Sequence, residues 1–335
     1  MRLATKLLGV TALAVVALLL VAGCGSSSGG GSPSGSASAS TSAKVYHIGV
    51  TQIVTHPALD AAVKGFKQAL ADKGIKATYD MQNAEGDMST AAQIAQKFAG
   101  ENLDLVLGVA TPTTQAVAKA DTSTPIIFTA VTDPAGAGIV PDPKAPAGNV
   151  TGVSDMLPVQ SHLDLIKQVV PNVKTVGALY NAGESNSVFL VKAETAAAAK
   201  MGIKVIPGTA STSAEVQQAA QSLVGRVDAF SVLTDNTVVS ALASVVKVAE
   251  QNHIPLIAGD TDSVKSGAAA AYGFNYYDLG YQTGVMAARV LTGTPIKDIP
   301  VEYAQKLQLA VNQKAATAQG ITLPAALVGK ANFKY

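Results

Sequence analysis

The sequence predicts an α/β protein built from two doubly wound parallel-sheet lobes that are joined by a hinge. Short apolar runs alternate with helical patterns along most of the chain. Two stretches, Leu103–Val117 and Val227–Leu242, repeat one plan: an Asp near the start, an apolar run, small polar residues, then an apolar-periodic helix. Such a plan is typical of a buried parallel strand that leads into a helix. A second echo, between Lys73–Lys76 (KGIK) and Met201–Lys204 (MGIK), places the two halves in register.

The first 24 residues predict a targeting segment. Arg2 and Lys6 precede an apolar run at Leu7–Val21, and small residues lead up to Cys24, the only cysteine of the chain. This placement resembles a bacterial lipoprotein box, which implies that residues 1–24 are a lipoprotein signal peptide and that Cys24 is lipidated. A plain secretory signal and a membrane-spanning anchor are the alternatives. The Gly/Ser-rich residues 25–43 are then a flexible tether.

Residues 44–153 carry the pattern of the N-terminal α/β lobe. The run Val45–Ile53 predicts a strand, and Pro57–Lys73 predicts a helix with proline at its start and Gly74 at its end. The further elements expected in this lobe are strand Ile75–Gln82, helix Asp87–Ala99, the strand and helix of Leu103–Val117, and strand Pro125–Val131.

Residues 154–262 repeat this order as the C-terminal α/β lobe, after a hinge segment near Gly152–Pro158. Residues 263–335 are expected to complete the second lobe and to cross back to the first lobe as a tail, with crossings near Asp260–Asp262 and Tyr303–Val311. The elements expected after the hinge are helix Val159–Val169, strand Val173–Tyr180, helix Ser187–Met201, strand Ile203–Pro207, helix Ser213–Leu223, strand Ile254–Ala258, strand Ala268–Tyr272 and helix Asp278–Leu291.

Composition and motifs argue against several classes of protein. Charged residues make up 14% of the chain, and without Arg2 and Lys6 the net charge falls from +1 to about −1, so no basic surface is expected for nucleic acid. The four histidines show no metal-ligand spacing, and Walker, H-E-x-x-H and C-x-x-C motifs are absent. We therefore expect no enzyme, no cofactor and no metal, and a monomer that binds a small molecule.

Polar and aromatic residues at the predicted strand ends are the candidate ligand contacts, because ligands of open α/β sheets bind outside the carboxyl ends of the strands. An amino acid would place its carboxylate on the helix start at Thr111–Thr114 and its ammonium on Asp235 or Asp260. The rings of Tyr180, Phe274 and Tyr276 are either ligand contacts or part of the core. The candidates are Gln52, His56, Thr111, Thr113, Thr114, Thr129, Asp133, Tyr180, Asn181, Asn186, Ser187, Asp235, Asn236, Asp260 and Phe274.

Several segments carry a family resemblance. HPALDAAVKGF, ATPTTQA, FTAVTDPAGAG, NVTGVSDMLPV, LTDNTV and DTDSVKSGA occur in this order within residues 44–330. They resemble the tryptophan/tyrosine-type substrate-binding proteins of ABC transporters, whose fold is the type I periplasmic-binding-protein fold. The resemblance implies a lipid-anchored receptor on the extracytoplasmic face of the cell membrane. It would capture an amino acid, for some members an aromatic one, and deliver it to ABC permease subunits.

Other functions would share this fold. Related type I receptors bind branched-chain amino acids, sugars, nucleosides or signalling molecules. A ligand-binding sensor lipoprotein would have the same two lobes, and so would the effector core of a repressor. In this chain, however, the leader and tether occupy the position of a DNA-binding head.

Overall fold

The computed structural model describes residues 44–335. The predicted signal peptide, Cys24 and the tether lie outside the described residues. Among residues 44–335, no helix combines the length and the apolar character needed to span a membrane.

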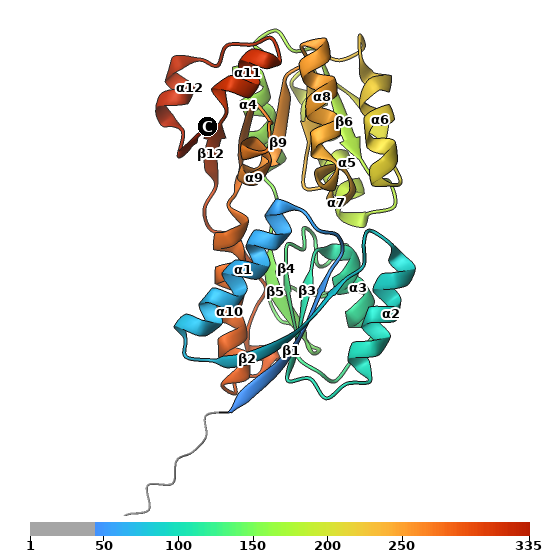
Figure 1. Ribbon diagram of the computed structural model, residues 1–335, viewed down its shortest axis with the longest axis vertical. Helices are drawn as coiled ribbons and strands as arrows, with labels where there is room; N and C mark the ends of the chain where they lie inside the picture. The colour runs from blue at the N-terminus through green and yellow to red at the C-terminus, as the bar shows by residue number, and fades with distance from the viewer. Residues whose placement is uncertain (1–43) are drawn as a thin grey trace, which may run out of the picture. The chain divides into compact units, whose positions relative to one another are not determined.

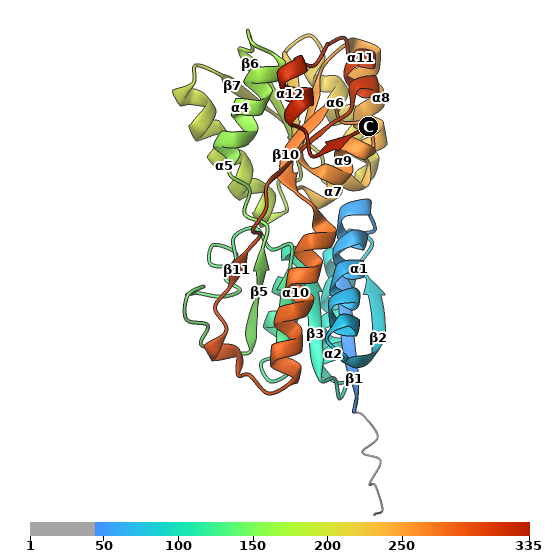
Figure 2. The ribbon, with the colours of Figure 1, turned by 90° about the vertical axis from the view of Figure 1, so that its left-hand side faces the viewer.

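The first lobe is built on a six-stranded sheet within the described residues, with strand order β11-β5-β4-β3-β1-β2 and every neighbouring pair parallel (Figures 1 and 2). Helices α1 and α10 pack against each other on one side of the sheet, and α2 and α3 lie on the other. The strands are β1 (Val45–Gln52), β2 (Lys76–Asn83), β3 (Leu105–Val109), β4 (Ile126–Thr129), β5 (Val150–Ser154) and β11 (Glu302–Tyr303); the helices are α1 (Pro57–Asp72), α2 (Met88–Ala99), α3 (Thr111–Ala120) and α10 (Tyr276–Leu291).

The second lobe has a seven-stranded sheet with order β13-β12-β10-β9-β8-β6-β7. Strand β12 runs antiparallel to β10, while the other described pairs are parallel. The strands are β6 (Thr175–Tyr180), β7 (Lys204–Thr209), β8 (Ala229–Val232), β9 (Leu256–Asp260), β10 (Ala270–Phe274), β12 (Gln308–Val311) and β13 (Phe333–Lys334); the helices are α4 (Val159–Val169), α5 (Ser185–Lys200), α6 (Val216–Leu223), α7 (Asn236–Ser240), α8 (Leu242–Asn252), α9 (Thr261–Lys265), α11 (Gln313–Ala318) and α12 (Ala325–Lys330), with short 3₁₀ turns at Ser213–Glu215 here and at Ile296–Asp298 in the segment between α10 and β11.

The two lobes share one topology. Read along the first sheet, the first five strands lie in the order β2-β1-β3-β4-β5, and the second sheet has β7-β6-β8-β9-β10 in the same order. Strands β3 and β8, which open the two repeated stretches, therefore occupy equivalent places. Both strands are wholly buried, as expected for parallel strands covered by helices on both faces. The sequence prediction of two doubly wound lobes is confirmed.

The described chain passes between the lobes at three places. It leaves β5 at Ser154 for α4, leaves β10 at Phe274 for α10, and leaves β11 at Tyr303 for β12 (Figure 2). The crossing that the sequence placed near Asp260–Asp262 is wrong, because Asp260 ends β9 and caps α9, after which β10 joins the same sheet. The predicted helix Asp278–Leu291 accordingly belongs to the first lobe, and the C-terminal tail ends in the second.

Candidate functional site

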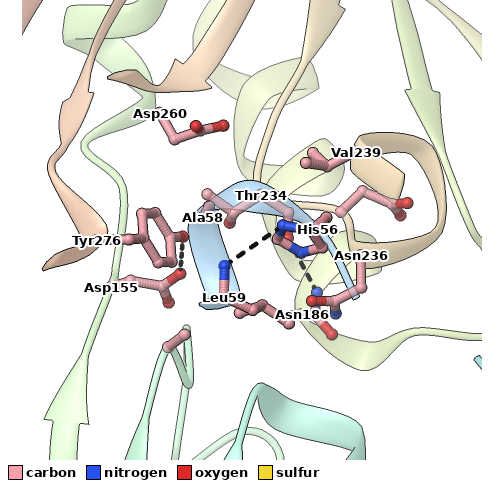
Figure 3. A pocket seen from close by; sticks show the side chains of 12 residues that line it. His56, Ala58, Leu59, Asp155, Asn186, Thr234, Asn236, Val239, Asp260 and Tyr276 are labelled. Atoms are coloured by element: carbon pink, nitrogen blue, oxygen red, sulfur yellow. Dashed lines mark hydrogen bonds between the residues drawn. The ribbon is translucent and has the colours of Figure 1, made fainter. Parts of the chain in front are cut away.

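A small cavity lies between the two lobes (Figure 3). The first lobe contributes the start of α1 and the residue after β4, the second lobe contributes the starts of α5 and α7 and the end of β9, and Asp155 and Tyr276 come from the first two crossings. The volume of this cavity is only ≈ 10 Å³, which is room for about one water molecule. The lining residues are His56, Ala58, Leu59, Ala130, Asp155, Asn186, Thr234, Asp235, Asn236, Val239, Asp260 and Tyr276.

The cavity is acidic. Asp155, Asp235 and Asp260 line it with 2%, 1% and 2% of their surface exposed, and no lysine or arginine is among its described lining residues. Burial raises the pKa of all three carboxyls, that of Asp235 to about 7 with a further contribution from the nearby Glu184. Buried carboxylates without a cation are costly. The arrangement is therefore suited to a ligand that brings a positive charge.

Two of these carboxylates cap helices of the second lobe. Asp260 precedes α9 and accepts hydrogen bonds from the backbone N–H and the hydroxyl of Ser263, at 2.8 and 2.6 Å. Asp235 precedes α7 and accepts from the backbone N–H groups of Val238 and Asn181, at 2.7 and 2.6 Å. Each carboxylate oxygen has two lone pairs, so both side chains keep capacity for a ligand donor.

The third carboxylate links two crossings between the lobes. Asp155 follows β5, and Tyr276 is the first residue of α10; the Tyr276 hydroxyl donates to Asp155 Oδ2 at 2.5 Å (Figure 3). Thr132 donates to the other carboxylate oxygen at 3.0 Å. Burial and the neighbouring carboxylates raise the pKa of Tyr276 well above its ordinary value, so the phenol remains a donor.

His56 caps α1 and faces the second lobe. Its Nδ1 accepts a hydrogen bond from the backbone N–H of Leu59 at 3.4 Å, and its ring also bonds the side chain of Asn236 across the cleft (Figure 3). Burial lowers the pKa of His56 to about 4, with a partial offset from Asn236. At neutral pH the ring is uncharged and adds no cation to the acidic cavity.

Two polar atoms of the cavity lining have no hydrogen-bond partner among the described residues. They are Asn186 Oδ1 and Thr234 Oγ1, and both are buried. Most buried polar atoms in native proteins are paired. An acceptor and a hydroxyl left unpaired beside three carboxylates can pair with the polar groups of a small ligand.

Five of the predicted site residues line this cavity: His56, Asn186, Asp235, Asn236 and Asp260. The others do not, and the reason for the threonines is local. Thr113 Oγ1 donates to the carbonyl of Val109 at 2.7 Å, and Thr114 Oγ1 donates to that of Ala110 at 2.8 Å, so both hydroxyls are used within their own turn. The residues outside the lining are Gln52, Thr111, Thr113, Thr114, Thr129, Asp133, Tyr180, Asn181, Ser187 and Phe274.

The remaining predicted residues have structural partners of other kinds. Gln52 donates to Val54 O and to Asp60, Thr129 accepts from Thr283, and Asp133 accepts from Gly136 N in a tight turn. Four others have these partners: the backbone N–H of Asn181 and the side chain of Ser187 hydrogen-bond Asp235, and Phe274 and Tyr180 pack with the first lobe's core cluster. The Thr111 hydroxyl is buried and has no partner among residues 44–335, although it does not line the cavity.

Sequence reasoning missed Asp155, Glu184 and Ala130. Asp155 lies just past a strand in the first crossing, and a search of the hinge segment for acids would have found it. The Glu184 carboxylate accepts from the backbone N–H of Thr237 at 3.1 Å and from the Asn236 side chain, which fixes the start of α7. Ala130 has φ +58°, a left-handed conformation that a non-glycine residue rarely adopts, and no sequence pattern signals it. Within residues 44–335, no group of three or more His, Cys, Asp or Glu side chains is placed to hold a metal.

The sequence and the fold agree with a known family. A sequence model of the family described as ABC transporter substrate binding protein matches residues 47–334. The chain belongs to this family. A tyrosine-binding protein from Clostridioides difficile is 43% identical over 281 residues, which cover 83% of this chain and 81% of that protein.

Solved structures of substrate-binding proteins lead to the same assignment. An ABC domain from Streptococcus pneumonia in complex with L-Trp is 38% identical, with a TM-score of 0.84 over 87% of this chain and 100% of that one. The ligand-free, open structure of a substrate binding protein with adhesive properties from Clostridium difficile is 41% identical, with a TM-score of 0.65 over 86% of this chain and 98% of that one. Sugar-binding proteins 14–17% identical share the type I periplasmic-binding-protein fold.

The tryptophan complex and the ligand-free open structure differ in how well they superpose on this chain. Sequence identity is nearly equal, yet the TM-score is 0.84 to the tryptophan complex and 0.65 to the ligand-free open structure. The lobes of this substrate-binding protein therefore lie closer to the arrangement of the complex. The small volume of the cavity between them agrees with a closed form.

Proposed function

We propose that this substrate-binding protein captures an aromatic amino acid, tyrosine or tryptophan, between its lobes and delivers it to an ABC permease. The observation that carries the proposal is the acidic cavity, which Asp155, Asp235 and Asp260 line without a lysine or arginine among the described lining residues. The choice of an aromatic ligand is supported by the tyrosine-binding relative and by the tryptophan complex.

In this proposal the ammonium group of the ligand lies between Asp155 and Asp260, with the unpaired Asn186 Oδ1 as a third acceptor. An ammonium has three N–H donors and pairs well with carboxylates. The three acceptors come from the first crossing and the second lobe, so the bound cation ties the hinge to that lobe.

The ligand carboxylate needs donors from the same cavity. The Thr234 hydroxyl has no partner among the described residues, and the start of α1, at Ala58 and Leu59, borders the same space. The N-terminus of this 16-residue helix favours an anion. We therefore propose α1 as the carboxylate site, in place of the α3 start that the sequence suggested.

Capture requires the lobes to open, because space for about one water does not admit an amino acid. In an open form the buried carboxylates would be hydrated, and closing without a cation would cost free energy. A zwitterion pairs those carboxylates and so shifts the population toward the closed form. The three crossings, at residues 154–159, 274–276 and 303–308, are the hinge segments in this scheme.

The cellular part of the proposal rests on the leader. With Cys24 lipidated, residues 25–43 would hold the lobes at the extracytoplasmic face of the membrane, close to the permease. Uptake of labelled tyrosine by cells with and without the gene would test delivery. Unchanged uptake, together with tight binding, would favour a sensor.

Calorimetric titration of the mature domain tests capture. Tyrosine is compared with tyramine, which lacks the carboxylate, and with 3-(4-hydroxyphenyl)propionate, which lacks the ammonium. We expect 3-(4-hydroxyphenyl)propionate to bind at least about 30-fold more weakly, since it leaves the buried carboxylates unpaired. Tyramine should bind about 5- to 100-fold more weakly, since it leaves the Thr234 hydroxyl and the α1 start without an acceptor. Asp260→Asn should weaken tyrosine by about 2–5 kcal/mol, whereas Asp164→Asn, at an exposed aspartate of the same lobe, should not. Equal binding of all three compounds would refute the zwitterion site.

A further inference from the structure

The central cavity borders a larger one, which we call the side slot; the inference drawn from it rests on the proposed amino-acid function. The side slot has a volume of ≈ 190 Å³, more than ten times what one water requires. It shares Ala58, Val239 and Asp260 with the central cavity. The residues that line it are Pro57, Ala58, Val239, Ser240, Leu242, Ala243, Asp260, Asp262, Ser263 and Ser266.

The walls of the side slot are suited to a ring. Pro57 and Ala58 come from the first lobe, and Val239, Leu242 and Ala243 come from the second, so apolar side chains of both lobes face the same space. Apolar surface buried against such walls is stabilising. A group bound there would contact both lobes and favour their closure.

A second neighbouring cavity has a different chemistry. Its volume is ≈ 200 Å³, but it shares only Asn236 with the central cavity. Its lining includes the carboxylates Glu85, Asp87 and Glu184, and serine and threonine side chains. The side slot is also lined by Asp260, Asp262 and three serines, but it has five apolar lining residues, whereas this cavity has Ile53 and Val54. An aromatic ring therefore gains less apolar contact here. Of the two spaces beside the central cavity, the side slot is the better place for the ring.

One lining residue of the side slot has an unused acceptor. Asp262 Oδ2 is buried and has no hydrogen-bond partner among residues 44–335. Burial, with a smaller contribution from Asp260, raises the pKa of Asp262 to about 6. At neutral pH the carboxylate is therefore charged and can accept a strong hydrogen bond.

We propose that the ring of the bound amino acid lies in the side slot and that Asp262 accepts a hydrogen bond from the ring's O–H or N–H donor. The tyrosine hydroxyl and the tryptophan indole N–H are both donors, whereas phenylalanine has none. A site built around such an acceptor rejects a ligand that leaves the acceptor unpaired. Asp262 thus selects tyrosine and tryptophan over phenylalanine.

The test compares ligands within one protein. Dissociation constants for tyrosine, tryptophan, phenylalanine and O-methyltyrosine, which keeps the oxygen but lacks the donor, are measured by calorimetry on the parent, Asp262→Ala and the nearly isosteric Asp262→Asn. In the parent, phenylalanine and O-methyltyrosine should bind about 10- to 100-fold more weakly than tyrosine. Asp262→Ala should remove most of this preference, because tyrosine loses its acceptor and phenylalanine no longer buries an unpaired carboxylate.

Asp164→Ala, at an exposed aspartate of the same lobe, is the matched control and should keep the preference. Each preference is the ratio of the dissociation constants of two ligands on the same variant. A general loss of stability affects both constants, so the ratio can still be compared between variants. Equal binding of tyrosine and phenylalanine to the parent would overturn the role of Asp262, and so would equal weakening of both in Asp262→Ala. In either case the proposed amino-acid function would stand. Failure of the parent to bind any aromatic amino acid would overturn the proposed function itself.

Discussion

The hydrogen bond between Tyr276 and Asp155 should stabilise the connection between the lobes more than any exposed tyrosine contact does. Asp155 belongs to the first crossing and Tyr276 to the second, and their side chains are 2% and 3% exposed. Tyr276→Phe removes only the hydroxyl, which leaves one oxygen of a buried carboxylate without its donor. Hydrogen bonds to charged groups contribute about 1.5–3 kcal/mol, so we expect a loss of that size in the free energy of unfolding.

The assay is urea denaturation followed by circular dichroism, on the parent, Tyr276→Phe, Asp155→Asn and the double variant. The coupling free energy from this cycle isolates the pair from the effects of each single change. Tyr281→Phe is the matched control, because Tyr281 lies on the same helix and also donates to an aspartate, Asp72, at 3.1 Å in an exposed position. Exposed contacts contribute little, so its loss should be much smaller.

Two results would contradict this reasoning. One is a loss for Tyr276→Phe no larger than that for Tyr281→Phe, which would mean that the buried bond contributes nothing beyond an exposed one. The other is a coupling free energy near zero between positions 155 and 276. Either result would mean that the contact between the two crossings adds nothing to stability, although Tyr276 and Asp155 are hydrogen-bonded in the structure.

Three further predictions concern pH, motion and anchoring. Burial raises the pKa of Glu194 from its ordinary 4.5 to about 7, so its contribution to stability is full below pH 4.5 and is lost as pH rises to 7. Relative to the parent, the free energy of unfolding of Glu194→Gln should therefore increase by about 3 kcal/mol across that range. A difference between the two proteins that stays constant with pH, measured by urea denaturation, would count against this. Small-angle scattering should show a smaller radius of gyration with saturating tyrosine, and an unchanged profile would argue against closure. Cys24→Ala should release the protein from the membrane fraction; unchanged fractionation would exclude lipidation as the anchor.

Much of the fold could be predicted because it depends on periodicity. Runs such as Leu105–Val109 and Ile126–Thr129 are wholly buried and parallel, as their apolar composition indicates. The likeness of the two lobes could be anticipated from the echo between the halves. The second crossing could not be predicted. Asp260–Asp262 has the polar sequence expected at the end of a lobe, but the next strand, β10, pairs with β9 in the same sheet. Nothing local distinguishes a helix that returns to its own sheet from one that packs on another.

The candidate site was predicted only where a residue type and a strand end coincide. Asp235 and Asp260 follow strands and cap helices, which is a local signal. Thr113 and Thr114 carry a similar signal, but their hydroxyls bond carbonyls of their own turn, and the sequence does not show which way a hydroxyl points. Asp155 also follows a strand, in the predicted hinge, but its hydrogen bond with Tyr276 of the second crossing is a tertiary contact that the sequence does not show.

The cost of the acidic cavity is also the source of its response to ligand. Three buried carboxylates with raised pKa values would be better solvated if the lobes were apart, so the empty protein should favour an open form. A ligand shifts a two-state equilibrium only by its difference in affinity for the two states. An ammonium that meets Asp155 of the crossing and Asp260 of the second lobe supplies that difference, because only the closed form brings both carboxylates to one cation. A sugar carries no such charge, and would leave the carboxylates as costly in the closed form as before.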